Sequence, residues 1–141
     1  MTEKSTKHKM CRVRAQLLLV RRLQGQLREM APRLKTLELT DMPKHGGGMP
    51  RGLDIQIAKK DALERMLERE SALLREYEAE ARDEMEKMRP EYYAFCAMYY
   101  LSGLSITDTA EMLERSERQC MRYRREIEGG TIEHEEATAM I

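Results

Sequence analysis

Two serines, Ser105 and Ser116, limit most strongly how this chain can fold, because each stands where a helix can begin. Ser105 is followed three residues later by Asp108, which makes a near capping box, and Ser116 by Gln119, which makes a full one. In both motifs the serine hydroxyl accepts a hydrogen bond from a backbone N–H of the first helical turn. Two helix starts so close together leave about two and a half turns for the first helix. The segment 103–128 is therefore predicted to be a helix-turn-helix.

Helical periodicity assigns an inner and an outer face to both predicted helices. The residues expected to point inward are Ile106, Ala110 and Leu113 in the first helix and Cys120, Tyr123 and Ile127 in the second. The residues expected to face DNA are Arg115, Ser116, Glu117, Arg118, Met121, Arg122 and Arg125. A polar, arginine-rich outer face on the second helix suits the reading of the DNA major groove.

The arginines of this face are given different roles by their positions. Arg118 and Arg122 lie one turn apart on the exposed face, so either could make a bidentate contact to guanine. Arg115 and Arg125, at the two ends, are better placed for phosphates. Glu117 could accept a hydrogen bond from cytosine or simply favour the helix N-terminus electrostatically.

The motif resembles the helix-turn-helix of sigma factor region 4 and, more closely, the small phage-encoded regulators of the RinA/ArpU type. The residues that carry the resemblance are Tyr99, Tyr100, Gly103, Ser105, Ala110, Leu113, Ser116, Cys120 and Tyr123. Two positions depart from the pattern: Glu114 stands where a turn glycine is usual, and Thr109 where a branched apolar residue is common. The resemblance implies sequence-specific binding of double-stranded DNA, transcriptional regulation of phage or prophage genes, and a contact with RNA polymerase.

Two long helices are predicted before the motif. The first, from about Met10 to Leu39, carries an unbroken heptad seam of Val13, Leu17, Val20, Gln24, Leu27, Ala31 and Leu34. Pro32 lies inside this pattern and should kink or break the helix, which could then end near Met30. The second, from about Asp54 to Met88, has an apolar stripe that must be buried against another long helix. The two could pair as an antiparallel hairpin or across a homo-oligomer.

Proline and glycine divide the chain into four segments. These are a basic helix and Gly/Pro connector (1–52), a long charged helix (53–89), a sigma region 4-like domain (90–130) and an acidic tail (131–141). The connector itself covers Thr40–Gly52. In the third segment Phe95, Met98, Tyr99 and Leu101 should supply most of the core, with the tyrosine hydroxyls at the surface. Gly103 should end that helix.

Charge is segregated along the chain although the formal net charge is zero. Residues 1–60 hold 14 basic and 5 acidic side chains, whereas residues 61–114 hold 6 and 14. Opposite blocks of charge favour pairing within the chain or across a dimer. Equally, both blocks could be solvated helix faces.

No enzymatic or metal-binding chemistry is predicted. Cys11, Cys96 and Cys120 are far apart, which indicates buried thiols in a reducing compartment rather than a metal or redox site. The three histidines are also scattered, so neither a catalytic residue nor a cofactor is expected. The longest apolar run is too short to cross a membrane, and a cytoplasmic location follows.

The sequence therefore predicts an all-α protein, with long coiled-coil-like N-terminal helices and a C-terminal three-helix bundle that contains the helix-turn-helix. The function predicted is that of a DNA-binding transcriptional regulator. One alternative is a helical scaffold or protein-interaction module that does not bind DNA, which the zero net charge would suit. Another is a phage small terminase subunit, although its DNA-binding motif would be expected nearer the N-terminus.

Overall fold

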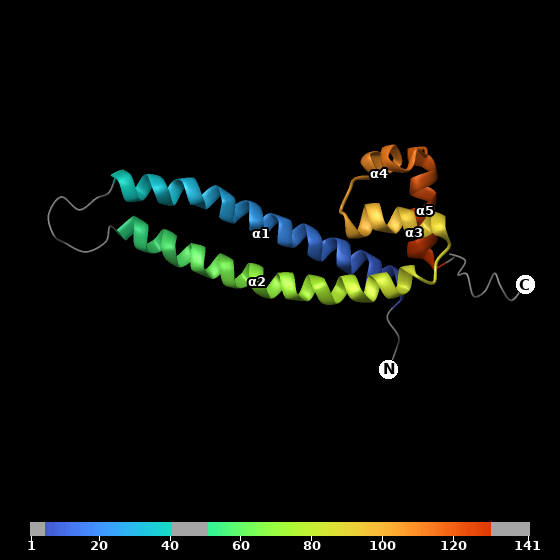
Figure 1. The fold of residues 1–141 in the computed structure, drawn as a ribbon, viewed down its shortest axis with the longest axis horizontal. Helices are drawn as coiled ribbons and strands as arrows, with labels where there is room; N and C mark the ends of the chain where they lie inside the picture. The colour runs from blue at the N-terminus through green and yellow to red at the C-terminus, as the bar shows by residue number, and fades with distance from the viewer. Residues whose placement is uncertain (1–4, 41–50, 131–141) are drawn as a thin grey trace, which may run out of the picture. The chain divides into compact units, whose positions relative to one another are not determined.

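The computed structural model describes residues 5–40 and 51–130, with the backbone alone for residues 32–40, 51 and 53. Its elements are α1 (Thr6–Thr40), α2 (Arg51–Met85), α3 (Pro90–Cys96), the π-helical segment η1 (Ala97–Leu101), α4 (Ile106–Leu113) and α5 (Glu117–Gly129) (Figure 1). The expected all-α class, with two long helices followed by a short-helix domain that ends in a helix-turn-helix, is confirmed. Residues 41–50 of the predicted connector, and the acidic tail, lie outside the described residues.

The described residues fall into two compact units. One unit holds the residues up to Leu18 and those from Leu73 onward, and the other holds Leu19–Ala72. In both units a stretch of α1 lies beside a stretch of α2, and the two helices run in opposite directions (Figure 1). In the structure α1 and α2 therefore pair within a single chain, as an antiparallel hairpin, which is one of the two arrangements that the sequence allows.

The predicted seam of α1 is right at Val13 and Val20, which are buried, but wrong at alternate positions. Leu17 and Leu27 are only partly buried, Gln24 and Ala31 are exposed, and the side chain of Leu34 lies outside those that the structure describes. The structure buries in their place Gln16, Leu23 and Met30. At Leu23 and Met30 the shift covers a leucine and a methionine in place of a glutamine and an alanine, which removes more apolar surface from water, whereas at Gln16 it covers a glutamine in place of a leucine.

The predicted break at Pro32 is also absent from the structure. Helix α1 continues through Pro32 to Thr40 instead of ending near Met30. A proline in a helix interior removes a backbone hydrogen bond and clashes with the preceding turn, at a cost of about 3 kcal/mol, which the packing of a long helix against its neighbour can outweigh.

The basic start of α1 pairs with the acidic end of α2. The carboxylate of Glu84, which is buried, accepts hydrogen bonds from the Thr6 hydroxyl and from the Lys9 ammonium at 3.3 Å. One turn further along α1, Arg12 forms an ion pair with Glu80. Burial alone would raise the pKa of Glu84, but the hydrogen bonds from Thr6 and Lys9 outweigh it and lower that pKa. The opposite charge blocks seen in the sequence therefore meet within one chain.

The core of the C-terminal helices differs from the predicted one around η1. Phe95 and Tyr99 are buried as expected, whereas Met98 and Leu101 are only partly buried. Tyr100 is instead 1% exposed.

A π-helical turn explains why two consecutive tyrosines point inward. The Ser102 N–H donates to the Ala97 carbonyl at 3.0 Å, across five residues rather than four. The extra residue in the turn rotates the following side chains and brings Tyr100 inside. The prediction that the tyrosine hydroxyls reach the surface is wrong for Tyr100, whose hydroxyl is buried without a hydrogen-bond partner among the described residues.

Candidate nucleic-acid interface

The two capping serines begin α4 and α5 as the sequence predicted. The Ser105 hydroxyl accepts a hydrogen bond from the Asp108 N–H at 3.1 Å, and the Ser116 hydroxyl accepts one from the Gln119 N–H at 3.1 Å. Between the helices, Glu114 has φ 55° and ψ 41°, a left-handed conformation that glycine adopts more readily. The turn is thus the one at which a glycine is usual, formed here with a glutamate.

The inner face of α4 is wider than predicted. Ala110 is buried as expected, while Ile106 and Leu113 are partly buried. Thr109 is the most deeply buried residue of the helix, with 0% exposure. Its hydroxyl has no hydrogen-bond partner in the part of the chain that the structure describes.

The inner face of α5 packs onto aromatic rings. Cys120, Tyr123 and Ile127 are all buried, as the helical spacing predicted. The ring centroid of Tyr123 lies 5.5 Å from that of Tyr92, in an edge-to-face contact. The Gln119 side chain donates to the Tyr123 hydroxyl at 3.0 Å, which adds a polar contact to this face.

The seven residues predicted to face DNA lie in the turn and on the outer part of α5, and all are exposed. They are Arg115, Ser116, Glu117, Arg118, Met121, Arg122 and Arg125. Among the described residues, Arg115, Arg118 and Arg125 form no ion pair, so their guanidinium groups can bind an external anion. The turn and α5 thus carry exposed arginines, a residue type that can donate hydrogen bonds to guanine or to phosphate.

Arg122 differs from the other arginines because a neighbour orients it. Its Nε lies 3.1 Å from Oε1 of Glu126, one turn along α5. Glu126 in turn accepts a hydrogen bond from the Tyr92 hydroxyl at 2.5 Å, and this bond lowers the pKa of Glu126. Neither Tyr92 nor Glu126 was predicted from the sequence to have a role in the site. The i, i+4 spacing of Arg122 and Glu126 was the signal that could have indicated this pair.

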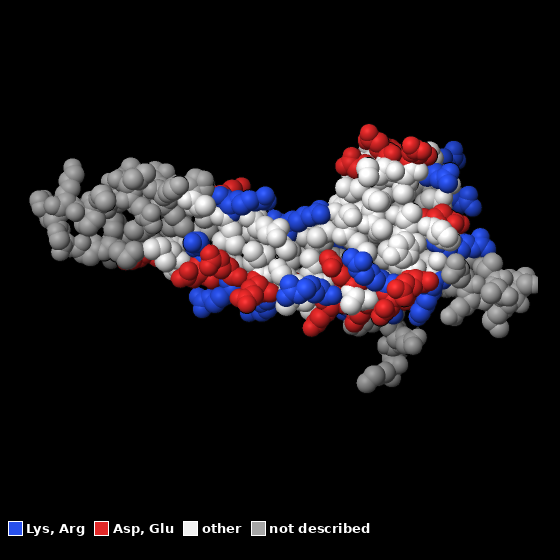
Figure 2. Space-filling model, viewed as in Figure 1, with Lys and Arg blue, Asp and Glu red and all other residues white. Residues whose placement is uncertain are grey.

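Acidic side chains gather on the neighbouring helix. Asp108 and Glu111 of α4 and Glu114 of the turn are all exposed. Figure 2 shows acidic atoms over α4 and basic atoms over the adjoining α5. This separation makes the basic side chains of α5 more attractive to an external anion than the acidic side chains of α4.

The start of α1 contacts the flank of α5. The Cys11 thiol donates to Glu128 at 3.1 Å, and Arg124 lies 3.4 Å from the same carboxylate. Burial, and then the bond to Glu128, raise the pKa of Cys11 to about 11. Arg14 of α1 also donates to the Tyr99 carbonyl at 2.5 Å. The Cys11–Glu128 bond therefore joins α1 to α5, and the Arg14–Tyr99 bond joins α1 to η1.

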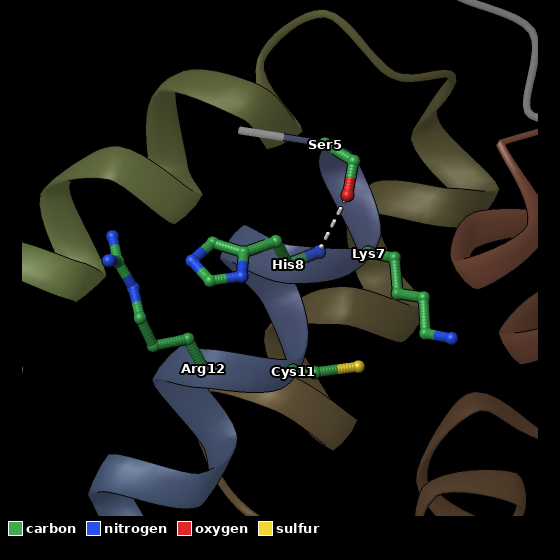
Figure 3. Close-up of a pocket in the computed structure, with 5 residues that line it drawn as sticks. All are labelled: Ser5, Lys7, His8, Cys11 and Arg12. Carbon is green, nitrogen blue, oxygen red and sulfur yellow. Dashed lines mark hydrogen bonds between the residues drawn. The ribbon is translucent and has the colours of Figure 1, made fainter. Parts of the chain in front are cut away.

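The first turn of α1 adds a cation, Lys7, that was not predicted from the sequence to belong to the site. Figure 3 shows Lys7 and Cys11 directed to one side of α1, and His8 and Arg12 directed to the other. Because Cys11 bonds to α5, Lys7 extends on the α5 side, and its side chain is exposed. The spacing of four residues between Lys7 and Cys11 would have indicated the shared face once the position of Cys11 was known.

Comparison of the chain with protein-family models, curated proteins and solved structures finds no match. No helix in the described part of the chain is long and apolar enough to span a membrane. Among the same residues, no three histidine, cysteine, aspartate or glutamate side chains come together in a way that could hold a metal ion.

Proposed function

We propose that the chain is a sequence-specific DNA-binding protein that regulates transcription, as do the phage-encoded regulators of the RinA/ArpU type that its motif resembles. One observation carries the proposal. The second helix of a helix-turn-helix, fixed on its inner face by Cys120, Tyr123 and Ile127, presents exposed arginines on its outer face. That combination is what insertion into the major groove requires.

Each cation has a role that its position supports. Arg118 and Arg122 read guanine, and Glu126 holds Arg122 in place before DNA arrives. Arg115 and Arg125 bind phosphates on either side, and Lys7 of α1 binds a third. On the basis of the resemblance alone, the proposal extends to a contact with RNA polymerase.

Selection from a library of random duplexes tests the proposal. The purified protein is expected to enrich one short motif within a few rounds. On that motif the logarithm of affinity should fall with the logarithm of salt concentration with a slope of about −3, if Arg115, Arg125 and Lys7 each neutralise one phosphate. Failure to enrich any motif, together with no binding of any duplex at low salt, would refute DNA binding.

A second candidate function is a protein-interaction module, and the outer face of α4 favours it. Met112 is 62% exposed and lies on that face near Asp108 and Glu111. An exposed apolar side chain among acids suits a basic protein partner rather than DNA. The same selection separates the two functions, because a protein-interaction module enriches no DNA motif.

A further inference from the structure

The unit formed by Leu19–Ala72 carries a groove between its two helices. Met30 and Glu29 of α1 line one side, and Lys59, Ala62 and Leu63 of α2 line the other. The groove has a volume of about 440 Å³. Gln26 and Gln56 also line it, so the open hollow has apolar, amide and charged side chains around it.

Apolar side chains remain exposed on α2 beside this groove. Ile55 is 52% exposed and Met66 is 38% exposed. They lie seven residues before and four residues after Ala62, so all three share one face of α2. The seam between the helices covers Val20 and Leu23 of α1 but leaves this second stripe in contact with water. Two paired helices can bury one seam each, and a second apolar stripe calls for another helical surface.

The charges at the edges of the groove indicate which kind of protein surface can pack against it. Glu29 and Lys59 stand on opposite helices at its edges, and neither forms an ion pair with another described residue. In a two-fold symmetric pair, any residue contact is made twice, so Glu29 of one copy can meet Lys59 of the other on both sides of the axis. A surface that is apolar in the middle and carries one charge of each sign is complementary to itself.

We propose that this groove and the apolar stripe beside it form the interface at which two copies of the chain associate, with Ile55, Ala62 and Met66 on the stripe and two Glu29–Lys59 pairs at the edges of the groove. The inference does not depend on DNA binding, because it rests on the Leu19–Ala72 unit alone. If DNA binding also holds, the dimer carries two recognition helices and reads two half-sites.

The mass of the protein in solution, measured by sedimentation equilibrium from 1 to 100 µM, tests the proposal. The wild type is expected to approach twice the chain mass of 16.5 kDa. Glu29→Lys alone and Lys59→Glu alone should each raise the dissociation constant of the dimer at least about tenfold, because like charges then face each other. The doubly reversed protein, Glu29→Lys with Lys59→Glu, should regain the wild-type constant within about threefold.

A matched control is Glu76→Lys, which makes the same charge change at an exposed position of α2 outside this unit. It should leave the dissociation constant unchanged, and circular dichroism should show that every variant remains helical. A wild-type mass of one chain at 100 µM would overturn the proposal. So would single reversals that leave the constant unchanged, or a double reversal that fails to restore it.

Discussion

The buried hydroxyl of Thr109 gives a prediction whose size follows from the structure. Thr109 is 0% exposed, and its Oγ1 has no hydrogen-bond partner among the described residues. A buried polar group left unpaired costs roughly 1–3 kcal/mol. Valine has nearly the same shape and a similar helix propensity, and it carries a methyl group in place of the hydroxyl. Thr109→Val is therefore expected to raise the free energy of unfolding by about 1 kcal/mol.

Urea unfolding followed by circular dichroism measures this effect. With an m-value of about 2 kcal/mol/M, the midpoint should rise by about 0.5 M. Thr107→Val is the matched control, since Thr107 lies in the same helix but is exposed. That variant should stay within about 0.5 kcal/mol of the wild type. If Thr109→Val is no more stable than the wild type while the control is unchanged, the reasoning about an unpaired hydroxyl fails.

Three further predictions concern the turn, the thiols and a buried carboxylate. Glu114→Gly should raise the free energy of unfolding by about 0.5–1 kcal/mol in the same assay, because Glu114 has a positive φ that strains a residue with a side chain. A loss of stability would mean that another interaction of Glu114 outweighs this strain. Cys96 and Cys120 are buried, and burial raises the pKa of both thiols. A thiol reagent should therefore label them only after the protein unfolds. Rapid labelling of the folded protein would contradict their place in the core. Because the pKa of Glu84 is lower in the folded than in the unfolded state, its stabilisation is complete above the unfolded pKa and is lost as pH falls through the folded one. Wild-type protein should therefore lose more stability than Glu84→Gln between about pH 5 and pH 3, and equal losses would show that the Glu84 contacts contribute nothing.

Local signals in the sequence predicted the helix-turn-helix well. The caps at Ser105 and Ser116 depend on residues three positions away, and the inner face of α5 depends on a simple helical period. Neither needs information from distant parts of the chain. Even the strained turn was indicated, because Glu114 occupies a position where glycine is usual.

Features that depend on tertiary packing were not predicted. The seam of α1 moved from Gln24 to Leu23 because the partner helix, not the heptad period, decides which residues are covered. The inward position of Tyr100 follows from one π-helical hydrogen bond, which the spacing of residues in the sequence does not predict. Both errors arise where several local arrangements are nearly equal and long-range contacts choose between them.

In the candidate site, too, the local features were predicted from the sequence and the tertiary contacts were not. Helical spacing identified the exposed arginines of α5, but not the Tyr92 hydroxyl that anchors Glu126 behind Arg122. That contact joins residues 34 positions apart in the chain. The exposed Lys7 of α1 was missed for the same reason, because only the fold brings α1 to the flank of α5.

The most direct test of the central proposal compares two double variants that lose the same charge. Arg118→Ala with Arg122→Ala removes two exposed arginines from α5, and Arg75→Ala with Arg82→Ala removes two exposed arginines from α2. Fluorescence anisotropy should measure the affinity of both for the selected DNA motif, after circular dichroism has shown that they are folded. The α5 variant is expected to lose about 2–6 kcal/mol of binding free energy, at about 1–3 kcal/mol for each guanine contact, while the α2 variant binds nearly as well as the wild type. Equal affinity of the α5 variant and the wild type would show that α5 does not read DNA.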